Sequence, residues 1–327
     1  MSKISLRDIA ETAGVSTATV SYALNNSPQV STKTRQKIQA IAASMNYYPN
    51  RNAQGLRTKH SKIICTLINT FTSLFNGSLV DKIRKELKAL GYSLVVIDSS
   101  NIDLVDSQLF DGLIVFNYTT SNTQLIALLN HINIPVILMA NEIDHPQTDC
   151  VVINNAQGMQ LLVNLFTQSK HQHPAIITGP SDSYNSNIRL TSCKHAIQHL
   201  YPNFDFTKRI VDGNFETHKA QQIAATLLEQ GVNFFFCLND AMAYGVYQAA
   251  AARNLKIGID ISVTGFDNNP FYLEHYLPRL TTIDPMIEHW GKRVVSLLIS
   301  RLENCSHKRL ETIYSPVKLI TGESIAI

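Results

Sequence analysis

Six polar or aromatic side chains that lie far apart in the chain have the types needed to bind a ligand rich in hydroxyl groups. They are Asn69, Ser73, Arg189, Phe215, Asn239 and Asp267. Arginine offers forked donors, asparagine and aspartate bind hydroxyl groups, and phenylalanine stacks on the face of a ring. Taken singly, each is better explained as a cap, a turn or a salt-bridge residue; Asp240, for example, should cap the helix that begins at Ala241. Taken together, the six predict a site for a polyhydroxylated small molecule.

The motifs of the common enzyme classes are missing from the sequence. It has no phosphate-binding G-x-x-x-x-G-K-[ST] loop, no G-x-G-x-x-G after a strand and no G-x-S-x-G. The close histidine pairs, His171 with His173 and His195 with His199, lack the glutamate of a zinc-protease motif. We therefore expect no catalytic residue, no metal and no cofactor.

Strand-like and helix-like stretches alternate from about Lys62 onward and would position the six side chains. Apolar runs predict strands over 63–69, 93–97, 112–117, 136–140, 151–153, 175–178, 234–238 and 261–266. Amphipathic stretches predict helices over 79–90, 158–168, 188–200, 218–230 and 241–253. This order predicts an α/β body of two doubly wound, parallel-sheet lobes. Such sheets bind ligands at the carboxyl ends of their strands, so a cleft between the lobes is the expected site.

In the N-terminal stretch Leu6–Asn25, capping residues and apolar spacing predict two short helices joined by a tight turn. Ser5 and Ser16 would cap the two helices, and Gly14 would end the first. This pattern predicts a helix-turn-helix. The outward face of its second helix would carry Thr17, Ala18, Ser21 and Tyr22, and its small polar residues suit a helix that enters the major groove. The alternative is a small helical hairpin that binds no DNA.

A third helix is predicted over 32–45, capped by Ser31. Lys33, Arg35 and Lys37 lie near its start, where they would either meet DNA phosphates or form an ordinary solvated face. Three helices make a small all-α head.

The charge distribution agrees with a DNA-binding head. Residues 1–60 contain eight Lys or Arg and two Asp or Glu, whereas the rest of the chain contains 20 and 23. A basic head on a mildly acidic body predicts that the head alone binds a polyanion. No apolar run is long enough to span a membrane, and the five cysteines are dispersed. Since the charged start of the chain does not look like an export signal, we expect a cytoplasmic protein without a membrane partner.

Residues 50–58 are expected to be disordered when free and helical when docked, because nine residues cannot hold a helix alone in water. Leu56 has two explanations. It could be a linker leucine that packs on the body, or an apolar wedge inserted into the minor groove of DNA.

The stretches L-R-D-I-A-E-T-A-G-V-S-T-A-T-V-S, V-S-T-K-T-R and N-Y-Y-P-N-R-N-A-Q-G-L resemble the lactose-repressor/galactose-repressor (LacI/GalR) family of bacterial transcription regulators. The resemblance covers essentially the whole chain. It implies that Thr17, Ala18 and Tyr22 read bases and that Leu56 kinks the centre of the operator. The DNA-binding residues that we expect are Ser5, Ser16, Thr17, Ala18, Thr19, Ser21, Tyr22, Asn25, Ser31, Thr34, Asn50, Ala53 and Leu56.

The resemblance also implies a body similar to periplasmic sugar-binding proteins, with chain crossings near Ile153, Ile283 and Tyr314 and a last first-lobe helix over 285–302. The expected domains are a head over 1–48, a hinge helix and linker over 49–61, a first lobe over 62–154 and 285–313, and a second lobe over 155–284 and 314–327. Arg189, Asn239 and Asp267 match the effector motifs of the family, with Phe215 as its ring-stacking aromatic residue.

The chain departs from the family pattern at three places. Tyr22 stands where many members have an arginine, so the operator should differ from theirs. Asn154–Asn155 replaces an acidic-amide pair and removes a negative charge near the cleft. The segment 98–112 is short, which puts the edge of the first sheet in question.

The sequence thus predicts a repressor of sugar uptake or catabolism genes that binds a pseudo-palindromic operator and is controlled by a small molecule, a sugar or sugar derivative, in the cleft between the lobes. Two-fold pairing through the helix at 79–90 and the following strand would give a homodimer. The C-terminus has no leucine heptad to pair dimers into a tetramer. The alternative is a global carbon regulator that responds chiefly to a protein partner.

Overall fold

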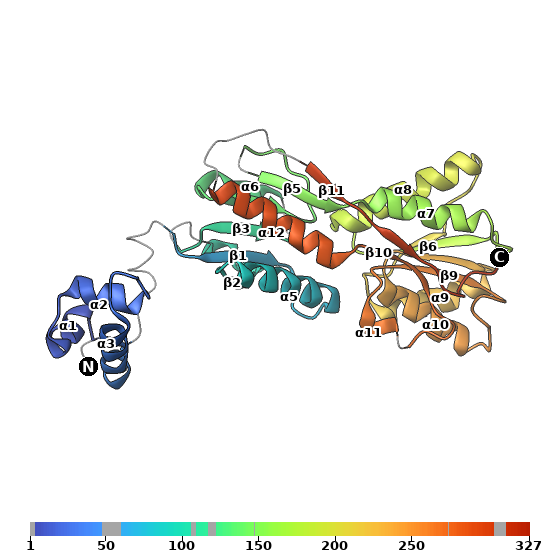
Figure 1. The fold of residues 1–327 in the computed structure, drawn as a ribbon. Helices are drawn as coiled ribbons and strands as arrows, with labels where there is room; N and C mark the ends of the chain where they lie inside the picture. Colours follow the sequence, from blue (N-terminus) through green and yellow to red (C-terminus); the bar gives the residue numbers. More distant parts are fainter. Residues whose placement is uncertain are drawn as a thin grey trace. The chain divides into compact units, whose positions relative to one another are not determined.

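The computed structural model describes residues 4–47, 60–105, 109–116, 122–146, 148–273, 275–303 and 312–327. The chain divides into two compact units, Met1–Ser61 and Lys62–Ile327, called the head and the body below (Figure 1). None of the helices in these described ranges is long and apolar enough to cross a membrane.

The described part of the head contains α1 (Leu6–Ala13), α2 (Thr17–Leu24) and α3 (Thr32–Ser44). Each helix begins at a serine side chain that accepts a hydrogen bond from a backbone N–H three residues later, and α1 ends at Gly14, whose φ of 71° is left-handed. A small core joins the helices; its buried members are Ile9, Ala10, Ala13, Val20, Ala23, Val30, Ile38 and Ala42. The predicted helix-turn-helix is therefore present, and α3 ends one residue earlier than expected.

The body is built on two sheets. The first has the strand order β11-β5-β4-β3-β1-β2, with every neighbouring pair parallel. Its strands are β1 (Ile63–Ile68), β2 (Ser93–Asp98), β3 (Gly112–Val115), β4 (Val136–Leu138), β5 (Thr148–Ile153) and β11 (Thr312–Ser315). The helices that accompany it are α5 (Leu74–Ala89), the 3-10 helix η1 (Ser99–Leu104), α6 (Asn122–His131) and α12 (Ile287–Glu303). The half of the body built on this sheet is called the first lobe.

The second sheet has the order β12-β10-β9-β8-β6-β7 and is parallel except for β12, which runs antiparallel to β10. Its strands are β6 (Pro174–Thr178), β7 (Ile210–Asp212), β8 (Phe234–Cys237), β9 (Ser262–Phe266), β10 (Thr281–Asp284) and β12 (Lys318–Ile320). The helices of this second lobe are α7 (Asn155–Phe166), α8 (Tyr184–Leu200), α9 (Thr217–Glu229), α10 (Asp240–Ala251) and α11 (Pro270–Leu273).

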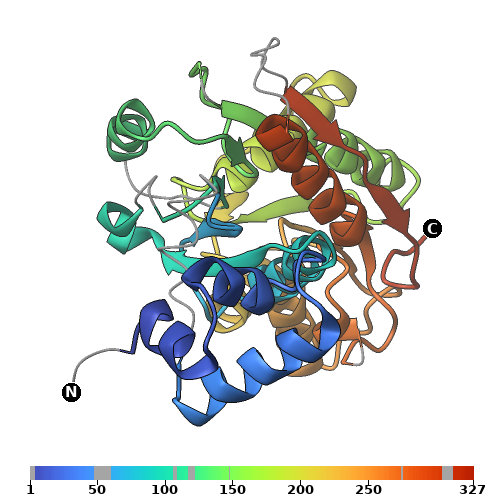
Figure 2. The ribbon, with the colours of Figure 1, turned by 60° about the vertical axis from the view of Figure 1, so that its left-hand side comes forward.

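The chain passes between the two sheets three times within the described residues: from β5 to α7, from β10 to α12 and from β11 to β12. Consequently α12 and β11 lie beside first-lobe elements that are distant in sequence (Figure 2). Two contacts secure α12 there. The Trp290 indole N–H donates to the Val151 carbonyl at 2.7 Å, and Arg301 makes two bonds, of 2.8 and 2.6 Å, to the buried carboxylate of Asp149.

Two α/β lobes on mostly parallel sheets were correctly predicted, with β12 as the antiparallel exception and most strand and helix ends shifted by a few residues. The predicted elements omit β7, β10, β11, β12, α6 and α11. The four strands are three or four residues long, too short for a periodic signal. The short segment 98–112 does not disrupt the edge of the first sheet. The edge strand β2 pairs with β1 along its whole length, and the 3-10 helix η1 follows β2.

Candidate functional site

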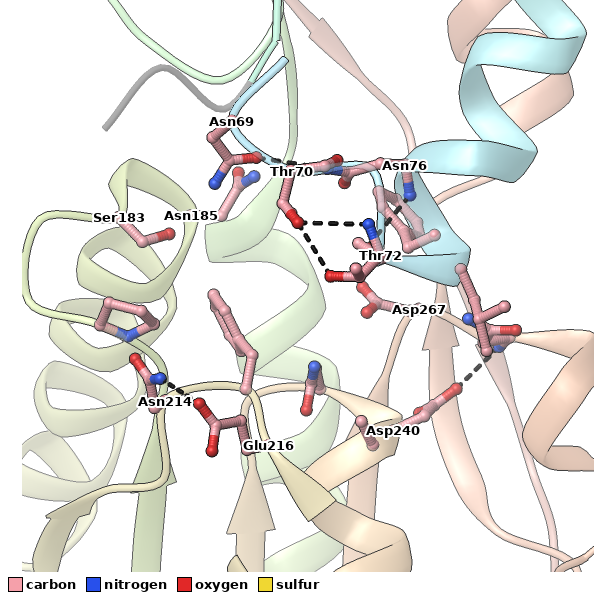
Figure 3. Close-up of a pocket in the computed structure, with 18 of the residues that line it drawn as sticks. Asn69, Thr70, Thr72, Asn76, Ser183, Asn185, Asn214, Glu216, Asp240 and Asp267 are labelled. Carbon is pink, nitrogen blue, oxygen red and sulfur yellow. Dashed lines mark hydrogen bonds between the residues drawn. The ribbon is translucent and has the colours of Figure 1, made fainter. Parts of the chain in front are cut away.

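A cavity of about 470 Å³ lies between the lobes, and all six of the side chains predicted to bind a ligand line it. Figure 3 shows the cavity, with Asn69 and Asp267 on opposite lobes. These six side chains meet in one cavity because four of them lie at the carboxyl ends of parallel strands. Asn69 follows β1, Phe215 follows β7, Asn239 follows β8 and Asp267 follows β9. Parallel strands present these ends at one edge of each sheet, which is where doubly wound folds bind ligands.

Arg189 is the most firmly held of these residues. It lies on α8, its side chain is 3% exposed, and its guanidinium sits 3.6 Å from the centre of the Phe266 ring. Its Nε donates to the Asn155 side chain at 2.8 Å, and its Nη1 donates to the Leu238 carbonyl at 2.6 Å. These contacts fix the plane of the guanidinium in the cavity wall.

Two carboxylates accompany Arg189. Asp267 Oδ1 lies 3.4 Å from Arg189 Nη1, while Asp240 accepts from the Thr282 hydroxyl at 2.6 Å and from the Asn269 backbone N–H at 2.8 Å. Burial raises the pKa of Asp267 to about 6 against the opposing pull of Arg189. Burial, reinforced by the charge of Asp267, also raises the pKa of Asp240 well above its ordinary range. The wall thus carries two carboxyl groups and one guanidinium at low dielectric.

The expectation that Asp240 caps α10 was wrong. The cap is Asn239, whose side-chain oxygen accepts from the Met242 backbone N–H at 2.9 Å, and Asp240 is the first helical residue. Its carboxylate turns instead toward β9 and β10, since an added Cβ on Gly265 would lie 2.3 Å from Asp240 Oδ1. The predicted start of the helix is one residue too late, because asparagine and aspartate are both common at the N-cap position.

Phe215 reaches the cavity through a left-handed turn. Asn214 and Phe215 have φ values of 56° and 58°, and the turn is tied by a hydrogen bond from the Asn214 amide to Glu216. The ring lies against Gly179, where any Cβ would come within 2.2 Å of it. A glycine after β6 is therefore required for this ring position.

The first-lobe wall is neutral. Ser73 caps α5 by accepting from the Asn76 backbone N–H at 3.3 Å. Asn69 accepts from the Asn76 amide at 3.2 Å (Figure 3). Leu74 and Phe75 add apolar surface to the same wall.

Several lining residues were not predicted: Thr70, Thr72, Phe75, Asn76, Tyr184, Asn185, Asn214, Glu216, Asn269 and Tyr272. The predicted helix over 188–200 begins four residues late, which left Tyr184 and Asn185 out. Yet Asn185 and Arg189 are four apart and hence on one helix face, a signal that the sequence does contain. Asn155, which departs from the family pattern, bonds to two of the residues that line the cavity. Its amide donates to Asn185 at 2.9 Å, and its side-chain oxygen accepts from Arg189.

The expected DNA-binding residues of the head fall into three groups. Thr17, Ala18, Tyr22 and Asn25 are exposed on or next to α2. Ser5, Ser16 and Ser31 cap the helices, and Thr19 and Thr34 bond to two of those caps. The third group, Asn50, Ala53 and Leu56, lies outside the described residues.

Ser21 was wrongly expected to face outward, because it is 8% exposed and belongs to the buried side of α2 with Val20 and Ala23. Two of the three basic residues on α3 also have partners within the head. Arg35 donates to the carbonyls of Ser27 and Val30, and Lys37 donates to the Ala13 carbonyl.

Comparisons with known proteins agree with both units. Residues 5–50 match the model of bacterial regulatory proteins of the lacI family, and residues 163–325 match the periplasmic binding protein-like domain. The probable HTH-type transcriptional repressor ExuR of Bacillus subtilis (strain 168) is 33% identical over 324 residues, covering 94% of this chain and 95% of the relative. The repressor PurR of Vibrio atlanticus (strain LGP32) is 26% identical over 93% of both chains. A crystal structure of the lac repressor dimer bound to operator and the anti-inducer ONPF superposes with a TM-score of 0.87, at 26% identity over 100% of both chains.

Proposed function

Because this chain belongs to the LacI family of bacterial regulatory proteins, and so is a DNA-binding transcriptional repressor with an effector-binding body, we propose that it acts as a homodimer on a pseudo-palindromic operator and is controlled by an uncharged polyol, such as a sugar. Its targets would be genes of sugar uptake or catabolism. Since it must meet chromosomal DNA, we place it in the cytoplasm.

The observation that carries the effector half of the proposal is the gathering of six distant side chains in one cavity. Several of their polar atoms have no hydrogen-bond partner among the described residues: Arg189 Nη2, Asn239 Nδ2, Asn69 Nδ2 and Asp267 Oδ2. Together they offer donors and an acceptor beside the Phe215 ring, which suits a ring that carries hydroxyl groups.

The charge of the cavity favours an uncharged ligand. Among its lining residues, Arg189 is basic, whereas Glu216, Asp240 and Asp267 are acidic. Arg189 already faces Asp267, so a phosphorylated or carboxylated sugar would find no spare cation there and would meet the acidic groups.

The DNA half of the proposal is supported by the exposed face of α2. Thr17, Ala18 and Tyr22 would read base edges, with Tyr22 making a single hydrogen bond and an apolar contact. The serine caps place helix N-termini where backbone N–H groups can bind phosphates, so Ser5, Ser16 and Ser31 would position the head rather than specify sequence. Of the basic residues on α3, Lys33 is the best candidate for a phosphate, because Arg35 and Lys37 are bonded to head carbonyls.

The homodimer is supported by symmetry and by exposed apolar surface. Reading two half-sites needs two heads related by a two-fold axis. On the predicted pairing surface, at the end of α5 and on β2, Leu90 and Val95 are 51% and 37% exposed. We further propose that the lobe arrangement described here is the operator-binding one, given its similarity to the operator-bound lac repressor. An effector would then act by favouring another arrangement, a coupling typically of about 1–3 kcal/mol.

The decisive experiment is a pull-down of sheared host genomic DNA by the full-length protein, followed by sequencing. We expect one or a few palindromic sites beside sugar-related genes. Many scattered sites would contradict local control, and no enrichment even at low salt would contradict DNA binding itself.

The wedge role of Leu56 is tested separately on the recovered operator. Leu56→Ala should weaken operator binding at least about tenfold and leave binding to unrelated DNA within about twofold, because a wedge contributes only where the duplex is kinked. Equal losses on both DNAs would assign Leu56 to packing of the linker.

A further inference from the structure

The loop that carries Asp267 is bonded to the end of β10, where the chain leaves the second lobe. Asn268, the next residue of the loop, donates its side-chain amide to the Asp284 carboxylate at 3.1 Å. Asp284 is the last residue of β10. The backbone adds a second bond between the same segments, because the Asp267 N–H donates to the Ile283 carbonyl at 2.8 Å. The loop after β9 and the end of β10 are therefore joined twice.

Asp284 also fixes the start of the first-lobe helix α12. Its other carboxylate oxygen accepts from the Met286 backbone N–H at 2.7 Å. The Met286 carbonyl in turn accepts from the Trp290 N–H at 3.0 Å, so α12 starts from Met286. Pro285, between Asp284 and Met286, has a fixed φ angle, which limits the freedom of this short crossover. One carboxylate thus holds a second-lobe loop with one oxygen and the start of a first-lobe helix with the other.

Both segments that Asp284 joins have left-handed backbone. On the loop, Asp267 and Asn268 have φ values of 115° and 46°, and at the crossover Met286 has 51°. Asparagine tolerates a left-handed φ, but 115° lies outside the usual left-handed region and methionine rarely adopts one. The Asn268 Oδ1 atom is also buried without a hydrogen-bond partner among the described residues. Such strain persists only where surrounding contacts hold it, so these hydrogen bonds keep the loop and the crossover in the described conformation.

The structure leaves space beside these bonds. Asn268, Asp284 and Met286 line a second cavity, of about 560 Å³, which is also lined by Phe75 and Lys82 of the first-lobe helix α5. Because side chains do not fill the space on this side of the loop, hydrogen bonds rather than close packing set its position there. A displacement of the loop by a ligand can therefore pass along its hydrogen bonds to the crossover.

We infer that Asp284 is a positioning residue that couples a ligand at Asp267 to the angle between the lobes, through its bonds to Asn268 and to the start of α12. The inference rests on the proposed function, in which Asp267 binds the effector, and extends it to a residue that does not line the effector cavity. A ligand that moves Asp267 also moves Asn268, and the shared carboxylate passes this movement to a helix that Trp290 secures in the first lobe. Breaking either bond should therefore separate ligand binding from DNA binding.

The test measures the factor by which a ligand changes operator affinity, using the full-length protein and the operator fragment from the genomic pull-down. The ligand is the uncharged pentose, hexose or disaccharide that most raises the melting temperature of the wild type. Asn268→Gly removes the side chain and keeps a residue that adopts left-handed angles, and Asp284→Ala removes the shared carboxylate. Each variant should reduce the factor at least about threefold, while ligand affinity stays within about fivefold of the wild type.

An exchange of the two partners distinguishes positioning from a general loss of stability. Asn268→Asp alone places two carboxylates opposite each other and should reduce the factor as the other variants do. Combined with Asp284→Asn, it restores an amide-to-carboxylate bond between the two positions and leaves an oxygen at position 284 to accept from the Met286 N–H. The double variant should recover the factor to within about twofold of the wild type. No recovery would overturn the inference.

Glu288→Gln is the matched control. Glu288 lies in the first turn of α12 and pairs with Lys82 at 3.5 Å, so the change removes a charge at the same helix start from a pair within the first lobe. The factor should stay within about twofold of the wild type. An unchanged factor in Asn268→Gly and Asp284→Ala, or an equal reduction in Glu288→Gln, would overturn the inference. If the wild type enriches no operator, or no sugar of the panel stabilises it, the proposed function fails instead.

A second measurement needs neither operator nor ligand. In Asn268→Gly, amide hydrogen exchange should accelerate in the first turn of α12 as well as in the loop around Asp267. In Glu288→Gln the loop should exchange as in the wild type. Acceleration confined to the loop in Asn268→Gly would show that Asp284 does not connect the loop to the helix, and would overturn the inference.

Discussion

The two walls of the cavity hold their polar groups in different ways. In the second lobe, Arg189 and Asp240 are 3% and 1% exposed, and each is fixed by several hydrogen bonds. In the first lobe, Asn69 and Ser73 are neutral, partly exposed and tied to the start of α5. The second-lobe wall is thus organised before any ligand arrives, and its residues contribute to folding as well as to binding. The first-lobe wall should contribute less to folding, chiefly through the Ser73 cap of α5.

The largest effect should come from removing the cation of the second-lobe wall. Arg189→Met leaves Asp240 and Asp267 buried without their counter-charge and should lower the free energy of unfolding by about 3–5 kcal/mol, measured by urea unfolding of the body. The matched control is Arg84→Met, since Arg84 is exposed and pairs with Asp81 on the surface of α5. The control should cost less than about 1 kcal/mol. An equal loss of unfolding free energy in the two variants would mean that Arg189 stabilises the folded body no more than a surface arginine does.

Asp267 should matter most for the ligand. Its free oxygen can accept a hydroxyl hydrogen as a charged acceptor, so Asp267→Asn should weaken effector binding by about 10- to 100-fold. The ligand for this measurement is the one that most raises the melting temperature in a panel of uncharged pentoses, hexoses and disaccharides, and calorimetry gives its affinity. Stronger stabilisation by uronates or sugar phosphates would contradict the uncharged-ligand proposal and leave DNA binding untouched.

The raised pKa of Asp267, about 6, gives the cavity a pH dependence. Effector affinity should fall about tenfold between pH 7.5 and pH 5, because the protonated acid is a weaker acceptor. For the free energy of unfolding of the ligand-free protein, the effect of pH has the opposite sign. The folded protein binds the proton more readily than the unfolded chain, so the cost of the buried charge is present above pH 6 and is relieved as the pH falls toward 3.8. The variant Asp267→Asn should lose this pH dependence, and a profile identical to the wild type would assign it to another group.

The smallest effect should come from the first-lobe wall. Asn69→Ala removes one neutral donor, so affinity for the same ligand should fall by only about two- to fivefold with the melting temperature nearly unchanged. A loss as large as that of Asp267→Asn would show that both walls hold the ligand equally, and the contrast between them would disappear.

The head was the easier half to predict because its determinants are local. Ser5, Ser16 and Ser31 each lie three residues before the N–H that they accept from, and Gly14 stands where a left-handed residue must end a helix. Ser21 was assigned to the wrong face because α2 is short, so that one residue of rotation decides which side chains are buried.

In the body, the sequence determined the β-α-β order, the strand ends and hence the six cavity residues. It could not determine which further groups meet them. The role of Asp240 depends on Thr282 and Asn269, and that of Arg189 depends on Asn155, all distant in sequence. Short edge strands such as β7 and β12 also escaped prediction, because their pairing partners, not their own patterns, make them strands.

The amino-acid sequence by itself therefore determined the kind of protein: a capped helix-turn-helix head, a basic N-terminus and a two-lobed body with polar residues at strand ends. The tertiary structure alone decided the electrostatics and the connections of the site. Burial raises the pKa of Asp267, and the packing of α8 brings the Tyr184 ring against a cluster of first-lobe residues. Burial and contact are properties of residues brought together from distant parts of the chain, so no local pattern could specify them.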